Sequence, residues 1–307
     1  MKTFCLFATV VLTLSSCLET VIDLELPPHE PKLVVNSSNF VGQHFKVYVS
    51  HSLDPLSTSN FEFYSDATVT LFENGLVIDT LEFIDTTSFY LSNVMVEETK
   101  TYALQVNHPN YPVLNTKQIS TPITASIKSA THFSAPVSGT SNSSIEFQFD
   151  DSPESNYYML KLKAYSSYEG ELGEIITDSY AIGFSSSDPS FENGTMDFEG
   201  DFENFKVLFD DQLFNGQTKS IELTYENFFS EYEGDYKIDS IKLVFSTVDY
   251  DFFNYHTSRI LQNNTEGGAI FGTEPVNVYN SFMKADGTIS AYGLFSVSSK
   301  DTYLIIP

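Results

Sequence analysis

The sequence predicts an all-β protein: an N-terminal immunoglobulin-like β-sandwich, then a larger second β-sandwich-like domain with one inserted helix. The first observation is composition, since the chain has 27 phenylalanines and 18 tyrosines, and aromatic residues favour strands. The second is a period of two in hydrophobicity, which is typical of strands with one buried face. The third is that strand-like runs recur about every ten residues with turn residues between them, as in β-sandwiches.

The alternation is clearest in three stretches, which are HFKVYVSH (44–51), TYALQVN (101–107) and SIEFQFD (144–150). In each, every second residue is apolar, so one face of the strand is expected to be buried. Asn74-Gly75 stands between two further strand-like runs and predicts a tight β-hairpin.

One helix is predicted over 249–262, DYDFFNYHTSRILQ. Asp249 or Asp251 is placed to begin it, and the following NNTEGG to end it. The side chains expected on its apolar face are those of Phe253, Thr257, Ile260 and Leu261.

The N-terminus has the three parts of a secretory signal. Lys2 is followed by the uncharged run Phe4–Leu14 and then by small residues, a pattern too short for a membrane-spanning helix. Leu14-Ser15-Ser16-Cys17 resembles a bacterial lipobox, which predicts lipidation at Cys17; the alternative is an ordinary signal peptide with a chance cysteine. Cleavage before Cys17 would remove Cys5, leaving no cysteine for a disulfide, a nucleophile or a sulfur-ligated metal.

Composition shifts predict the domain organisation. The expected parts are a signal peptide (1–16), a lipid anchor and tether (17–31), the immunoglobulin-like sandwich (32–121) and the second β-rich domain (122–307). Within the second domain we expect an acidic insertion over 166–211, in addition to the helix over 249–262.

The charge balance excludes some partners. Aspartate and glutamate number 41 against 15 lysines and arginines, a net charge of −26. Nucleic-acid binding relies on basic surface, so no nucleic-acid partner is expected. Attachment to an anionic membrane through protein charge is excluded on the same ground.

No catalytic signature is found, and we predict that the protein is not an enzyme. The six histidines form no HxxxH or HExxH pair, so a helical zinc site is not expected. The sequence also lacks a GxSxG elbow, a P-loop and a GxGxxG motif. His256, on the predicted helix, is interpreted as a packing or hydrogen-bonding residue.

Calcium is the one metal for which the sequence offers candidates. In DFEGDFEN the acids Asp197, Glu199, Asp201 and Glu203 surround one glycine, and calcium prefers six to eight oxygen ligands. The EF-hand order is not met, and an edge strand with acids facing outward explains the same pattern. No other cofactor is expected.

Four stretches, taken in order, resemble an uncharacterised family of Bacteroidota outer-membrane lipoproteins, domain of unknown function 4249. They are IDLELPPHEPKLVVN (22–36), FDDQLFNGQTKSIEL (209–223), YDFFNYHTSRILQNN (250–264) and GTISAYGLFSVSS (287–299). The resemblance implies an outer-membrane lipoprotein that accompanies a TonB-dependent transporter. It implies no catalytic residue.

These observations favour a lipid-anchored, non-enzymatic binding or accessory protein that handles nutrients or polypeptides with a TonB-dependent transporter. Glu19, Asp23 and Glu25 after the lipobox favour the cell surface over the periplasmic face, since surface-exported lipoproteins of that phylum carry acids there. The sequence leaves two alternatives open. One is a surface hydrolase acting on glycans, with a catalytic pair from the acids of 166–211; the other is an adhesin or envelope scaffold.

Overall fold

The computed structural model describes residues 29–54, 57–58, 61–134, 142–170, 173–191, 195–197, 205–226, 237–266, 277–283 and 288–307. Contacts between Cα atoms divide the chain into Met1–Pro31 and Lys32–Pro307. All the helices and strands described below belong to the second unit.

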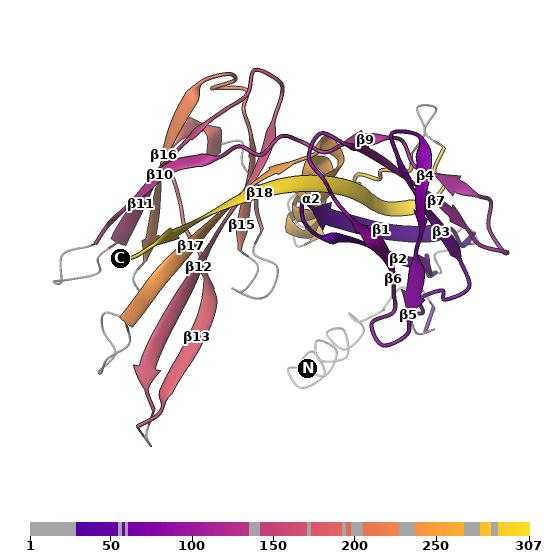
Figure 1. Cartoon of the computed structure of the whole chain (residues 1–307), viewed down its shortest axis with the longest axis horizontal. Coiled ribbons are helices and arrows are strands. Elements are labelled where there is room, and N and C mark those ends of the chain that lie inside the picture. Colours follow the sequence, from indigo (N-terminus) through magenta and orange to yellow (C-terminus); the bar gives the residue numbers. More distant parts are fainter. Residues whose placement is uncertain are drawn as a thin grey trace, which may run out of the picture. The chain divides into compact units, whose positions relative to one another are not determined.

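A ten-stranded sheet is the largest element of the fold (Figure 1). Along most of it the strands are hydrogen-bonded in the order β14, β15, β12, β17, β18, β1, β2, β6, β5, while β13 pairs with β12. The bounds are β14 (Thr195–Asp197), β15 (Lys206–Asp210), β12 (Tyr157–Glu169), β17 (Lys237–Val248), β18 (Tyr292–Ile305), β1 (Leu33–Phe40), β2 (His44–His51), β6 (Phe89–Met95), β5 (Glu82–Ile84) and β13 (Ile175–Ile182).

Two smaller sheets complete the described fold. One has five strands, β4 (Leu76–Thr80), β3 (Thr68–Glu73), β7 (Thr101–Asn107), β8 (Leu114–Asn115) and β9 (Ile119–Ser120). The other has three strands, β10 (Ile127–Phe133), β11 (Asn142–Asp150) and β16 (Thr218–Glu226). A short 3-10 helix, η1, spans Pro189–Phe191.

Each small sheet shares a hydrophobic core with one part of the large sheet. In the first core Phe45 of β2 packs edge-on against Tyr102 of β7, with ring centroids 4.8 Å apart. In the second core Phe149 of β11 lies 4.5 Å from Phe245 of β17, again between ring centroids. The inward residues are the alternating ones that the sequence identifies, and the all-β class is confirmed.

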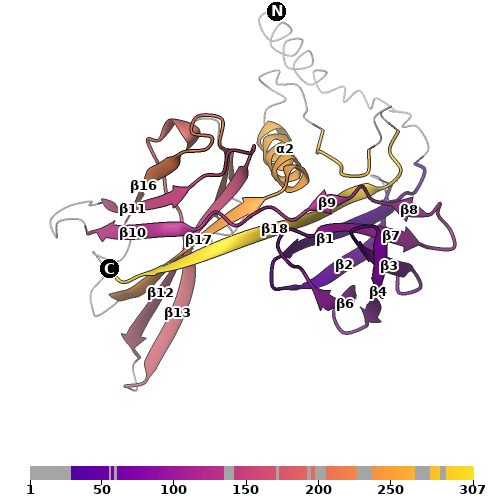
Figure 2. The same cartoon turned by 45° about the horizontal axis from the view of Figure 1, so that its top comes forward.

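Strand β18 belongs to both cores. It pairs in parallel with β1, from Val34↔Tyr292 onward, and antiparallel with β17, up to Ile241↔Ile305. Its residues Phe295 and Val297 lie in the first core and Ile305 in the second. Figure 2 shows this single long strand running past both groups of strands. The division at residue 122 stays a prediction. The contacts separate only Met1–Pro31 from the rest and keep Lys32–Pro307 in one compact unit.

The predicted hairpin is confirmed. Asn74 and Gly75 connect β3 to β4 with φ of 49° and 83°, the left-handed values that a two-residue hairpin turn requires. Residues 166–211, expected as an acidic insertion, contain the end of β12 followed by β13, η1, β14 and β15. Much of this stretch is therefore part of the large sheet.

The predicted helix is confirmed as α2, which spans Tyr250–Glu266. It extends beyond the expected end at Gln262, through the NNTE that we expected to terminate it. Its buried face also differs from the prediction. Phe252 and Ile260 are buried, whereas Leu261 is 43% exposed. The side chains of the sheet that pack with them are Met159, Leu208, Val248 and Leu294.

Two aspartates fix the start of α2. The carboxylate of Asp249 accepts the Phe252 N–H at 2.8 Å, which caps the helix, and the Val297 N–H of β18 at 2.7 Å. Asp251 accepts hydrogen bonds from Lys117 Nζ at 2.5 Å and from the Tyr279 hydroxyl at 2.9 Å. The helix is thereby tied to β18 and to the connection between β8 and β9.

Gly293 is required for the β18–β1 pairing. Its φ is +115°, and a Cβ atom there would collide with the carbonyl oxygen of Val35 and lie 2.8 Å from Asn36 Oδ1. We expect Gly293→Ala to lower the free energy of unfolding by about 2–4 kcal/mol. Gly42→Ala is the control, since Gly42 also has a positive φ, +80°, but no neighbour near its Cβ position.

The Gly42 variant should lose only about 1 kcal/mol of unfolding free energy, which is the cost of a positive φ for a residue with a side chain. Both values are measured by urea unfolding followed by circular dichroism. Equal losses in the two variants would contradict the role of close strand approach at Gly293.

Asp249 makes stability depend on pH. Burial of its carboxyl group raises its pKa from 3.8 to about 7, and the neighbouring charge of Asp251 adds to the rise. Between these two values the folded protein binds more protons than the unfolded chain, so this group's contribution to stability falls as pH rises.

We expect Asp249→Asn to remove that contribution, because asparagine also caps a helix but does not ionise. Relative to that of the wild type, the free energy of unfolding of the variant should rise by on the order of 1 kcal/mol per pH unit between about pH 4 and 7. Urea unfolding of both proteins at a series of pH values measures the difference. A difference that stays constant with pH would contradict a raised pKa.

Candidate functional site

An exposed cluster of aromatic rings lies beside strands β2 and β6. It consists of Tyr48, Phe61, Phe63 and Phe89 and is called the aromatic surface below. Tyr48 lies with ring centroids 5.6 Å from Phe63 and 5.5 Å from Phe89, and Phe61 lies 4.8 Å from Phe63. Phe61 is 55% exposed, Phe63 37% and Tyr48 36%. Many of the described aromatic rings are buried in the cores, so a group of them on the outside needs an explanation.

Strand alternation explains why Tyr48 points outward. Its neighbours in β2, Val47 and Val49, are buried in the first core. Residues directly opposite on paired strands share a face of the sheet, and Tyr48 pairs with Asn36, which pairs with Leu294. Since Leu294 packs with α2, the aromatic surface and the helix are on the same face of the large sheet.

A second aromatic cluster anchors the chain segment that contains Phe61 and Phe63. The ring of Tyr64 lies 4.1 Å from that of His108 and 5.4 Å from that of His51, between centroids. The Asn110 N–H donates to His108 Nδ1 at 3.2 Å, so Nε2 carries the proton and donates to Asp66 Oδ1 at 3.1 Å.

The chemistry of this second cluster is that of a support. Tyr64 and Tyr111 share a hydrogen bond of 3.0 Å between their hydroxyls. Burial and this bond raise the pKa of Tyr64, so its hydroxyl is neutral near pH 7 and is no general base. The cluster contains no activated nucleophile, and its bonds hold the 61–66 segment against β2, where Phe63 forms a bridge with Ser50.

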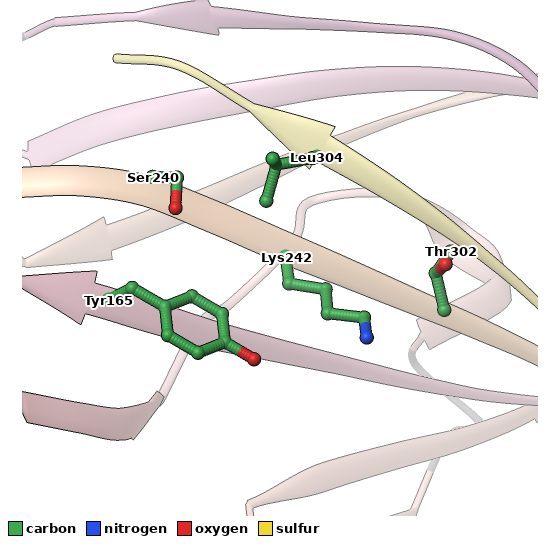
Figure 3. Close-up of a pocket in the computed structure, with 5 residues that line it drawn as sticks. All are labelled: Tyr165, Ser240, Lys242, Thr302 and Leu304. Atoms are coloured by element: carbon green, nitrogen blue, oxygen red, sulfur yellow. The ribbon is translucent and has the colours of Figure 1, made fainter.

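A pocket of about 450 Å³ lies on the large sheet where β12, β17 and β18 are adjacent (Figure 3). Its lining side chains are Tyr165, Ser240, Lys242, Thr302 and Leu304. Lys163, which lies next to it, places its ammonium 5.6 Å from the centroid of the Tyr165 ring. The pocket offers positive charge, hydroxyl groups and an aromatic ring on one concave surface.

The buried acids of the second core have structural roles. Asp151 accepts hydrogen bonds from the Tyr158 hydroxyl and, at 2.6 Å, from the Gly216 N–H. Asp211 accepts the Asn156 N–H at 2.7 Å. Burial raises the pKa of Asp211, and the charge of Asp151 contributes to the rise. These bonds close the turns around residues 151–156 and 211–217, so the two carboxylates stabilise the backbone of these turns.

The expected calcium ligands fall mostly outside the described residues. Asp197 is the last residue of β14, where it pairs with Lys206, while Glu199, Asp201 and Glu203 lie in undescribed stretches. Among the residues that the structure describes, no group of three or more acids, histidines or cysteines could hold a metal ion. The calcium site stays a prediction.

His256 is half-buried on the helix, with its ring centroid 4.3 Å from that of Phe252. Burial, with smaller contributions from the charges of Lys206, Arg259 and Lys161, lowers its pKa to about 3. A neutral, half-buried imidazole agrees with the packing interpretation. Cys17, the expected lipidation site, lies outside the described residues.

Sequence reasoning missed both surfaces as specific sites. The only available indication of the first was an aromatic residue at an outward position of β2, followed by the alternating FEFY of 61–64. The pocket gave no local indication, because its residues come from three strands far apart in the chain. Within the described ranges, no helix is both long and apolar enough to cross a membrane.

Comparison with known proteins gives the family but no activity. A crystal structure of "Putative membrane anchored protein" from Corynebacterium diphtheriae is similar over 74% of this chain and 56% of its own, with 12% identity and a TM-score of 0.20. This chain thus spans about half the length of that protein. No curated protein sequence matches this chain. The model of the family described as Domain of unknown function (DUF4249) matches residues 19–303. The chain belongs to this family.

Proposed function

We propose that the protein is a lipid-anchored outer-membrane lipoprotein, exposed at the cell surface, that binds a TonB-dependent transporter as a non-enzymatic accessory protein in nutrient or polypeptide handling. The observation that carries this proposal is the aromatic surface. Isolated exposed apolar residues are ordinary, but a contiguous group of them marks a site of interaction. Tyrosine and phenylalanine are among the residues enriched in protein interfaces.

The composition of the aromatic surface supports a protein partner. Its rings are in mutual contact and have few rotatable bonds, so they bury a large area at a small cost in entropy. Lys46 lies 5.2 Å from the centroid of the Phe89 ring and places one cationic group at the edge of an apolar centre. Apolar centres with polar rims are the usual anatomy of protein–protein interfaces.

The support beneath the rings favours tight binding. Tyr64, which follows Phe63, is held by stacking on His51, by a tilted ring contact with His108 and by its hydrogen bond to Tyr111. Side chains that are fixed before binding lose less conformational entropy when a partner docks. The aromatic surface is thus arranged before it meets its partner.

The anchor limits where the partner is. From Cys17 to Lys32 the chain can reach at most about 50 Å even when fully extended. A protein tethered in this way meets partners of the same membrane, and a transporter embedded there is within reach. The proposed role needs no cofactor, and the hydrogen bonds of Asp151 and Asp211 to backbone groups favour it over a hydrolase.

The anchor is tested by substitution of each cysteine. We expect Cys17→Ala to abolish incorporation of labelled palmitate and to leave an uncleaved precursor, because the lipid is attached to that thiol. Cys5→Ala is the matched control and should be labelled and processed like the wild type. Growing cells with labelled palmitate and following the protein by gel electrophoresis gives the result; a labelled Cys17 variant contradicts the assignment.

The partner is tested with the full-length lipidated protein, recovered from outer membranes in mild detergent. We expect near-stoichiometric recovery of one TonB-dependent transporter with the wild type, identified by mass spectrometry. Replacing both exposed rings, Phe61→Ser with Phe63→Ser, should reduce that recovery by roughly tenfold or more, as expected for hot-spot residues.

The control variant is Leu76→Ser with Val77→Ser, which removes two exposed apolar side chains from β4. It should recover the transporter as well as the wild type does. Recovery of the lipoprotein without a transporter would contradict the proposal. So would equal recovery of the transporter with the Phe61/Phe63 variant and with the wild type.

A further inference from the structure

We propose that the pocket between β12, β17 and β18 binds an acidic saccharide through Lys163 and Lys242. This site is separate from the aromatic surface and does not depend on the transporter partner. The anionic group of the sugar would lie at the two lysines, and its ring and hydroxyl groups would meet the aromatic and polar residues of the pocket.

The placement of the two lysines is the first observation. Lys163 of β12 and Lys242 of β17 are directly opposite each other in the antiparallel pairing, so their side chains leave the same face of the sheet. Like charges at directly opposed positions destabilise a sheet. Such an arrangement is therefore a cost to the fold that an anionic ligand would remove.

The surrounding charge makes the pair unusual. The chain has 41 acidic against 15 basic residues, and several described lysines are in ion pairs, namely Lys100 with Glu73, Lys117 with Asp251, Lys128 with Asp150 and Lys219 with Asp188. Within the described part of the chain, no carboxylate forms an ion pair with Lys163 or Lys242. On the β18 side of β17, Lys242 pairs with Leu304, which carries no charge.

The remaining lining residues favour a sugar. Two residues beyond Lys163 on β12, Tyr165 pairs with Ser240 of β17. Figure 3 shows the Tyr165 ring beside the Lys242 side chain, with Leu304 and Thr302 across from it. Aromatic and aliphatic side chains pack on the apolar faces of a sugar ring, while serine and threonine hydroxyls can both donate and accept hydrogen bonds. A volume of about 450 Å³ is in the range of small-molecule sites.

A peptide fits less well. The floor of the pocket is a face of the sheet, and β17 is hydrogen-bonded to β12 on one side and to β18 on the other. A peptide that binds as an added strand needs a free edge with unpaired backbone groups. Along β17 the floor offers only side chains, and its lysine, hydroxyl and aromatic groups are ones that a saccharide can bind.

The test is isothermal titration calorimetry of the full chain, purified in mild detergent, with digalacturonate as the probe. Methyl-esterified digalacturonate has the same rings without the charge, and inorganic phosphate has charge without a ring. We expect digalacturonate to bind, and each of the other two probes to bind at least about tenfold more weakly, because the ester lacks the charge-assisted hydrogen bonds and phosphate lacks the ring contacts.

Variants then locate the site. Lys163→Gln and Lys242→Gln should each weaken digalacturonate binding by roughly tenfold, while Lys128→Gln, an equal change of charge on β10, should not. All four proteins are checked for unchanged thermal unfolding. The Phe61/Phe63 variant should bind digalacturonate normally, which separates this site from the transporter interface.

Three results overturn the proposal. One is no heat of binding with digalacturonate at millimolar concentration. Another is equal affinity for phosphate, because the ring contacts would then contribute nothing. The third is an equal loss in the Lys128→Gln control, which would mean a general effect of charge and no pocket.

Discussion

The pairing of β18 with two different strands is the constraint on which the structure depends. One side of the strand forms a parallel ladder with β1 and the other an antiparallel ladder with β17. Parallel pairing requires a connection that returns the chain to the same end of the sheet, and here that connection is nearly the whole protein. The first core is completed by the last strand, so it is not made from one continuous segment, whereas the buried residues of the second core all lie within 125–305.

Helix α2 reinforces this junction. Its N-terminal aspartates bind the backbone of β18 and the side chains of Lys117 and Tyr279. Beneath it Ser296 and Ser298 are fully buried, and such small side chains let a helix approach a strand closely. Burial raises the pKa of Asp249, so we expect the stability of the junction to depend on pH, in a direction set by burial of a carboxyl group.

The two candidate sites are on the face of the large sheet that also contacts the helix. Tyr48 shares this face with Leu294 through the β1 pairings, and Lys242 shares it with Val248, which lies on the same strand and contacts the helix cluster. One site offers aromatic rings and the other positive charge with hydroxyl groups. A surface lipoprotein that docks a transporter and also captures an acidic saccharide would use both on one side of the molecule.

The sequence by itself determined the local features. Alternation predicted β2, β7 and β11, since one face of each is buried, and Asn74-Gly75 predicted the hairpin because few residues adopt its positive φ values. The helix was also predictable, but its face was not: Leu261 is exposed because the sheet contacts the side that carries Phe252.

Tertiary structure alone decided the long-range features. The opposition of Lys163 and Lys242 depends on the register of strands separated by some seventy residues, and so does the pocket beside them. The aromatic surface depends on the return of the 61–64 segment to β2. Register and return paths are set by the packing of whole faces, which no short stretch of sequence contains.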